Sequence, residues 1–253
     1  MDFYEQFHER LNSCRGYLER NVCLILIFHE IRLAFGSFLQ KIWIAGILFF
    51  GLLVTFGERN LESVISVLVL FVFFGTIIAV IGSSSSISGE IGGIADSVLS
   101  KSVRRWEYLL SKYISHATVT LLVYFSVLFG MVAILWNFKY LPDDLDYENL
   151  FFIIGLLGLE LIFFSSIGVM FSSIFSKTLL SLLCSIVVWF FLIFLFVATG
   201  WEFLYSPVEI LNKIALILTD SWDVDYWKLL LFYGGSPGVF FGISLLFFYR
   251  KDL

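Results

Sequence analysis

The chain has 253 residues, of which 59% are hydrophobic and only 15% are charged, and its net charge is −5. Soluble domains carry about 25% charged residues, so the composition excludes an ordinary soluble protein, and 30 Phe against three Pro exclude a disordered one. An acidic chain also lacks the basic surface of a nucleic-acid-binding protein, so we expect no nucleic-acid partner. The composition predicts an all-α integral membrane protein.

The N-terminal segment, residues 1–40, precedes the long apolar stretches. Leu18, Val22, Ile25 and Leu26 recur at helical spacing within it, with charged residues elsewhere. Such a stripe predicts a helix lying at the membrane interface. A helix that simply packs against the membrane-spanning bundle explains the same pattern equally well.

Six apolar stretches in residues 41–253 predict a six-span transmembrane domain, because a bilayer core needs about 20 apolar residues per helix. They cover residues 42–56, 61–81, 113–136, 150–175, 179–199 and 229–249. The apolar runs are continuous rather than alternating, which favours helices over barrel strands. The sixth stretch contains Gly234, Gly235, Pro237 and Gly238, which predict a kink or break.

The distribution of basic residues predicts the orientation. With six spans, 12 of the 16 Lys and Arg lie on the side that holds both termini, and four lie on the other side. By the positive-inside rule, both termini are expected in the cytoplasm.

The predicted cytoplasmic loop between the second and third spans, residues 83–112, holds the most informative pattern. Ile91, Ile94, Ala95 and Val98 recur at helical spacing, and a basic stretch, residues 101–112, follows. The stripe predicts a short amphipathic helix that a soluble motor protein could push. The pattern alone favours an interfacial helix with a basic flank.

The order of residues in this loop resembles the signature segment of type-2 ABC exporter permeases. In that family a Glu follows the second span, a Gly-containing turn comes next, then an Arg, and a Lys enters the third span. Glu90, Gly93, Arg105 and Lys112 occupy these places, whereas Ser102 stands where the family often has Pro. The end of the chain, residues 247–253, also resembles the family's exit from the sixth span. The resemblance implies that the following residues couple the chain to an ATPase: Glu90, Gly93, Asp96, Arg104, Arg105, Glu107 and Lys112.

The same resemblance implies the partners. They are an ABC ATP-binding subunit, a second permease subunit (identical or not) and the lipid bilayer of the plasma membrane. The chain has no G-x-x-x-x-G-K-[ST] phosphate loop, since Phe175 and Ser176 precede Lys177 and Thr178. We therefore expect this chain to bind no cofactor, and ATP and Mg²⁺ to bind the partner subunit.

Glu160 is the one carboxyl well inside a predicted span. An intramembrane ionisable residue suggests a functional site, so Glu160, Ser165 and Ser166 are candidates for the substrate pathway. The alternative is a structural carboxyl that is protonated or hydrogen-bonded to Ser or Thr of a neighbouring span. The sequence leaves the substrate open.

The outer loop, residues 200–228, predicts a surface or re-entrant helix that caps an exit route, or a helix lying on the outer leaflet. Two other classes of function compete with transport: a membrane anchor or assembly subunit, and an intramembrane enzyme. The enzyme is disfavoured because neither H-E-x-x-H nor G-x-S-x-G occurs. We expect no catalytic residue and no metal site, since the three Cys lack metal-ligand spacing.

Overall fold

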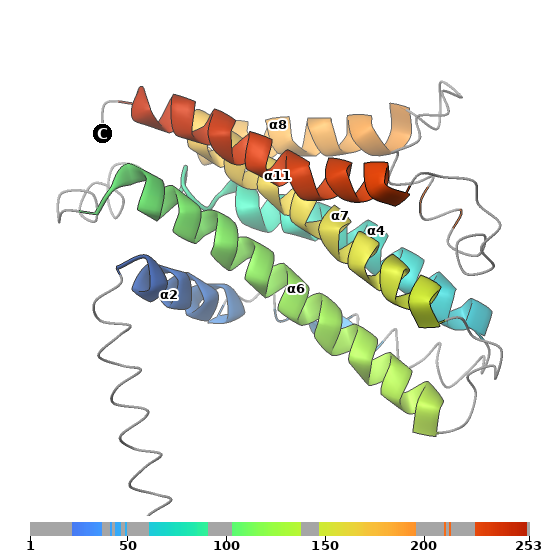
Figure 1. The fold of residues 1–253 in the computed structure, drawn as a ribbon. Coiled ribbons are helices and arrows are strands. Elements are labelled where there is room, and N and C mark those ends of the chain that lie inside the picture. Colours follow the sequence, from blue (N-terminus) through green and yellow to red (C-terminus); the bar gives the residue numbers. More distant parts are fainter. Residues whose placement is uncertain are drawn as a thin grey trace, which may run out of the picture.

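The computed structural model describes residues 22–36, 41, 44–46, 49, 61–90, 103–137, 147–195, 210, 213 and 226–251. Within these residues the chain forms helices and no strand, which confirms the all-α class for the described part (Figure 1). In chain order the helices are α2 (Val22–Gly36), α4 (Leu61–Ser84), α6 (Arg105–Asn137), α7 (Tyr147–Ile174), α8 (Thr178–Phe190), the π-helical turn η1 (Phe191–Leu195) and α11 (Tyr226–Tyr249).

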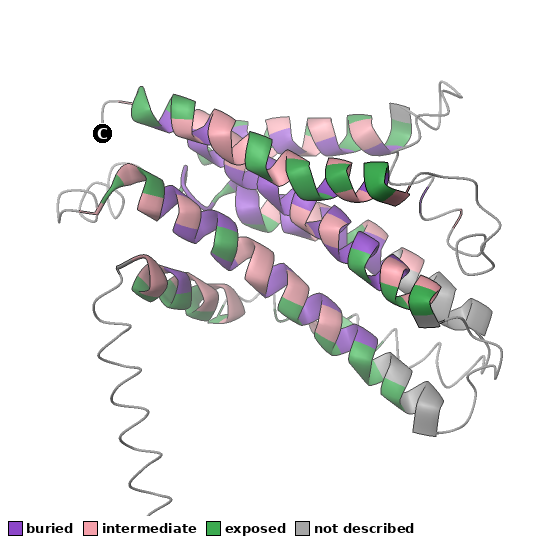
Figure 2. Cartoon of the chain, in the orientation of Figure 1, coloured by how far each residue is buried: buried purple, intermediate pink, exposed green. Residues whose placement is uncertain are grey.

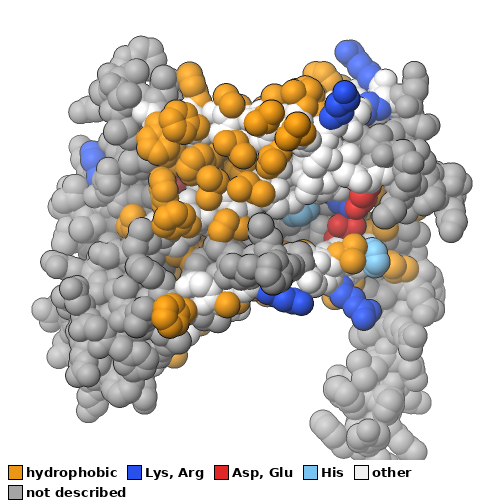
Figure 3. Space-filling model, turned by 180° about the vertical axis from the view of Figure 1, so that it is seen from behind, with side chains coloured by type: hydrophobic (Ala, Val, Ile, Leu, Met, Phe, Trp, Pro, Cys, Tyr) orange, Lys and Arg blue, Asp and Glu red, His pale blue; other side chains and the backbone are white. Residues whose placement is uncertain are grey.

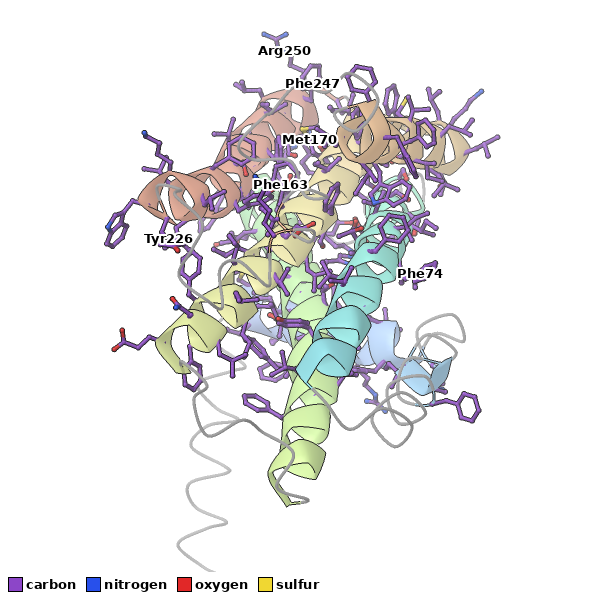
Figure 4. The ribbon with its side chains drawn as sticks, turned by 90° about the vertical axis from the view of Figure 1, so that its right-hand side faces the viewer. Phe74, Phe163, Met170, Tyr226, Phe247 and Arg250 are labelled. Carbon is purple, nitrogen blue, oxygen red and sulfur yellow. The ribbon has the colours of Figure 1, made fainter. Side chains whose placement is uncertain are left out.

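Helix α7 is the centre of the bundle. It packs against α4, α6, α8 and α11, and most of its length is buried (Figure 2). Phe163 lies between α7 and α11, with its ring centroid 5.3 Å from that of Tyr233 and 5.5 Å from that of Phe240 (Figure 4). Phe74 of α4 points away from the bundle and is 52% exposed, as suits a side chain that faces lipid.

Helices α4 and α7 approach each other closely because small residues line their contact. A Cβ added at Gly168 of α7 would lie 2.8 Å from the carbonyl oxygen of Val80 in α4. Ser172 and Ser173 of α7 are fully buried near the same end of the helix. Small residues of this kind let helix backbones approach within a membrane, where apolar side chains gain little by leaving lipid for protein.

Three of the described helices are long and apolar enough to cross a membrane: Arg105–Gly130, Glu148–Ile174 and Tyr226–Tyr249. Two shorter apolar helices, Phe71–Ser84 and Thr178–Phe194, overlap the predicted second and fifth spans. Most of the predicted first span, 42–56, and most of the outer loop, 200–228, fall outside the described residues. Six spans therefore remain a prediction.

Two helices differ from their predicted spans. Helix α6 begins at Arg105 instead of Tyr113, and its 33 residues reach about 50 Å at about 1.5 Å per residue, well beyond a bilayer core. Helix α11 continues through Gly234–Gly238, with Pro237 inside it, so of the kink or break expected there the break is absent. Pro237 has no backbone N–H and so leaves one helix hydrogen bond unformed. In the same turn, the Ser236 Oγ donates a hydrogen bond of 2.6 Å to the Phe232 carbonyl oxygen.

Helix α2 lies along α6, on the side away from α11 (Figure 1). The prediction that this part of the N-terminal segment is helical is confirmed for Val22–Gly36. The contact with α6 agrees with a helix that packs against the bundle. One side of α2, including Phe28 and Leu33, is exposed, so a helix that also lies at the membrane interface is compatible with the structure.

Candidate functional site

A partly buried ionic cluster lies at the end of α4 and joins three parts of the chain. It consists of Glu30 of α2, Glu90 in the turn after α4, and Tyr108 and Lys112 of α6, and we call it the Glu90 cluster. The Lys112 Nζ lies 2.5 Å from the Glu90 Oε1 and 2.7 Å from the Glu30 Oε1. The Tyr108 Oη donates a hydrogen bond of 2.5 Å to the Glu90 Oε2. The lysine side chain is only 1% exposed, so its charge depends on these two carboxylates.

The start of α6 determines which of its residues face this cluster. The Glu107 Oε2 accepts a hydrogen bond of 3.2 Å from the backbone N–H of Arg104, which is one half of a capping box and defines where the helix begins. Tyr108 and Lys112 are four residues apart, so they share one face of the helix. That face is buried, whereas Arg104 and Trp106 are exposed.

The same end of α6 holds the end of α11. The Arg105 Nη1 lies 3.0–3.2 Å from the carbonyl oxygens of Phe248, Tyr249 and Lys251, which close the last turn of α11. A cation at these carbonyls satisfies their hydrogen bonds and complements the helix dipole. Tyr108 also stacks on Phe248, with ring centroids 5.9 Å apart. Residues of the predicted coupling loop therefore contact the last helix directly.

Serines of α7 and α8 hold the turn at residues 85–90. The Ser172 Oγ accepts hydrogen bonds from the backbone N–H groups of Ile87 and Ser88, at 2.8 and 2.9 Å. The Ser181 Oγ donates to the Ser84 carbonyl oxygen at 2.7 Å. These bonds satisfy backbone groups that the end of α4 would leave unpaired, so the turn has a fixed place in the bundle.

The cysteine of α2 marks the contact between α2 and the first turn of α6. The Cys23 Sγ lies 3.8 Å from the Glu107 carbonyl oxygen. Burial, together with the nearby Glu107 carboxylate, raises the pKa of the Cys23 thiol. The thiol therefore acts as a small packing group at this contact, because the reactive thiolate is disfavoured.

The structure brings together some of the predicted coupling residues and leaves others apart. Glu90 and Lys112 form an ion pair, Arg105 reaches α11, Glu107 caps α6, and Arg104 is exposed. Gly93 and Asp96 lie outside the described residues.

Sequence reasoning missed two members of the Glu90 cluster. Tyr108 could have been found from its spacing of four residues before Lys112. Glu30 stands 82 positions before Lys112 in the printed sequence, so no local pattern links the two.

Glu160 lies in the middle of α7, away from the Glu90 cluster. It is fully buried, and neither carboxyl oxygen has a hydrogen-bond partner among the described residues. Ser165 and Ser166 are also buried, and the Ser166 Oγ donates to its own helix at the Ile162 carbonyl oxygen, 2.7 Å away. The hydrogen bond to a neighbouring span that the structural alternative predicted is thus absent from the described part of the chain.

No group of three or more His, Cys, Asp or Glu that could hold a metal ion occurs within the described ranges, and we assign no metal site.

The comparison with protein families identifies the chain. The sequence profile of the ABC-2 family transporter proteins matches residues 20–253, which is nearly the whole chain. The chain belongs to the ABC-2 transporter family. No curated protein matches its sequence. The resemblance seen in the loop at 83–112 is therefore confirmed at the level of the family, and the protein is a permease subunit of an ABC transporter. Permeases of this family are membrane-embedded transport components of the plasma membrane that associate with an ABC ATP-binding subunit.

Proposed function

We propose that this permease is the transmembrane subunit of an ATP-driven exporter and that segment 83–112 couples it to a separate ATP-binding subunit. ATP and Mg²⁺ bind that subunit, and a second permease copy or relative completes the pathway. One observation carries the proposal. The Glu90 cluster and Arg105 tie the two ends of this segment to α2, α6 and α11.

A push by the ATP-binding subunit on residues 91–102 would be transmitted to the helices of the permease at both ends of that stretch. At one end, Glu90 is bonded to Lys112 and Tyr108 of α6. At the other end, Arg105 holds the last turn of α11. A buried charge pair resists separation because each unpaired partner is costly, so the Glu90–Lys112 pair makes α6 move with the segment. The hydrogen bonds of Arg105 to the end of α11 link that helix to the same motion. A packed bundle of this kind changes between discrete arrangements, which suits a transporter with inward-facing and outward-facing states.

The proposed topology has six spans, with both termini and segment 83–112 in the cytoplasm and residues 1–40 as a separate N-terminal segment. The excess of basic residues on one side supports this orientation. Within the bundle we propose Glu160, Ser165 and Ser166 as pathway residues. The support is Glu160 itself, since an ionisable group at this depth costs a few kcal/mol and is seldom kept without a role.

The test is the ATPase activity of the permease reconstituted in liposomes with the ATP-binding subunit that co-purifies with it. Glu90→Gln and Lys112→Met should each lower the permease-dependent stimulation of ATP hydrolysis by roughly tenfold. A change of this size corresponds to a typical coupling free energy between two sites. The charge reversal Glu90→Lys with Lys112→Glu should restore part of it, because the ion pair is re-formed.

The matched control is Glu148→Gln, which removes a carboxylate at the start of α7 and should leave the stimulation unchanged. Stimulation that survives in both Glu90→Gln and Lys112→Met would contradict the proposed coupling role. Failure of any ATP-hydrolysing subunit to co-purify would favour a membrane anchor instead.

A further inference from the structure

A cavity of about 400 Å³ lies beside the Glu90 cluster, between α2, the end of α4 and α6. Seen from the face opposite to that of Figure 1, acidic side chains lie in a hollow of the surface, with basic and histidine side chains beside them (Figure 3). The volume lies within the range of pockets that bind small organic molecules. The cavity is therefore large enough for a ligand.

The charge of the cavity favours a cation. Glu30 and Glu90 both line it, and their side chains are 16% and 20% exposed. Lys112, which they share, is 1% exposed and lies behind them. Two carboxylates around one ammonium leave one negative charge in excess, on the side that faces the cavity.

A hydroxyl without a partner points to a ligand that donates hydrogen bonds. Ser86 lines the cavity and is only 9% exposed, and its Oγ has no hydrogen-bond partner among the described residues. A buried hydroxyl that stays unpaired costs free energy, which a bound donor would recover. A primary ammonium has three N–H donors, enough for two carboxylates and this hydroxyl.

The remaining wall is partly apolar and contains no aromatic cage. Leu33, Ile78, Ile81 and Val119 form its apolar part, and none of the described lining residues is Phe, Tyr or Trp. Its polar part consists of Ser85, Ser115, His116 and Thr120. A quaternary ammonium is usually held by aromatic rings, so the wall favours an ammonium that carries N–H groups. The apolar side chains suit a hydrocarbon portion next to that ammonium.

We propose that this cavity binds an amphiphilic primary amine, with its ammonium between Glu30, Glu90 and the Ser86 Oγ and its hydrocarbon portion against Ile78 and Val119. The amine is either the headgroup of an aminophospholipid or a free alkylamine. The site is distinct from Glu160 and the proposed pathway, and it requires neither ATP nor the partner subunit.

The test uses the full-length permease in phosphatidylcholine nanodiscs, with empty nanodiscs subtracted, and radiolabelled decylamine as the probe. Saturable binding is expected, and decanol and decyltrimethylammonium should compete at least roughly tenfold more weakly than unlabelled decylamine, because neither makes the charged hydrogen bonds. Equal competition by decanol would overturn the proposal.

Variants locate the site. Glu30→Gln should weaken decylamine binding by roughly tenfold, since it removes the excess charge while the Glu90–Lys112 pair remains. Ala34→Phe, on the same helix, should block binding by filling the cavity without changing its charge. Glu148→Gln is the control and should bind as the unmodified permease does. Unchanged binding in both Glu30→Gln and Ala34→Phe would place the amine elsewhere and overturn the proposal.

A final arm separates the two sources of the amine. Phosphatidylethanolamine added to the nanodiscs should suppress decylamine binding if the site recognises a lipid headgroup. If it has no effect while decylamine still binds in a Glu30-dependent way, the ligand is a free amine. Both results support an ammonium site.

Discussion

Lys112 shows how a single residue can hold several elements together. Its ammonium is almost completely buried and lies between carboxylates from α2 and from the turn after α4. The predicted loop boundary ended at this lysine, yet α6 begins seven residues earlier and carries it inside the helix. A charged residue that the sequence suggested would lie near the membrane surface is thus part of the core.

We expect Lys112→Met to be strongly destabilising. It leaves Glu30 and Glu90 side by side without a cation, and breaking a buried ion pair costs about 3–5 kcal/mol. Glu30→Gln should cost much less, because Lys112 keeps Glu90 as its partner. Thermal unfolding of the purified variants in a mild detergent measures both effects. Equal losses of stability in the two variants would show that the cluster does not depend on the lysine charge.

At the scale of elements, the contact between α4 and α7 fixes where the turn at 85–90 lies. The helices can approach closely at Gly168, and Ser172 then reaches the backbone of Ile87 and Ser88. This contact places Glu90 beside α6. A change in the spacing of α4 and α7 is therefore expected to disturb the Glu90 cluster as well.

Gly168→Ala tests this contact. Its Cβ would lie 2.8 Å from the Val80 carbonyl oxygen, so the helices must separate, at a cost of about 1–3 kcal/mol. Gly155→Ala is the matched control on the same helix, since nothing lies within 4 Å of its Cβ. It should be neutral or should stabilise α7 by up to about 1 kcal/mol, because Ala has the higher helix propensity. Thermal unfolding distinguishes the two, and a similar result for both variants would contradict the close approach.

At the scale of the whole molecule, the distribution of charge predicts how the permease sits in the membrane. The side that holds both predicted termini carries 12 of the 16 basic residues. A reporter domain fused after Leu253 that fluoresces only in the cytoplasm should therefore be bright, and one fused at residue 143, in a predicted outer loop, should be dark. The opposite pattern would reverse the orientation, and brightness at both sites would contradict the number of spans between them.

Much of the helical framework could be predicted from the sequence. Continuous apolar runs predicted helices that α4, α6, α7, α8 and α11 match in position. Their ends were less predictable, because the start of α6 depends on capping by Glu107 and on the burial of its first turns by α2 and α11. Of the kink or break expected at Gly234–Gly238, the break is absent, because the backbone hydrogen bonding that a membrane helix requires outweighs the low helix propensity of these residues.

The candidate site was predicted only in part. The sequence by itself determined the class of the protein and its apolar segments, because these follow from composition and from a local order of residues. The resemblance of segment 83–112 to type-2 permeases also singled out Glu90, Arg105 and Lys112, whose coupling role is a proposal. Only the tertiary structure brought Glu30 and Tyr108 to Lys112, set Arg105 against the end of α11 and left Glu160 without a hydrogen-bond partner among the described residues. The physical reason is that preference for a membrane is a property of each segment, whereas the pairing of buried polar groups depends on how the segments pack together.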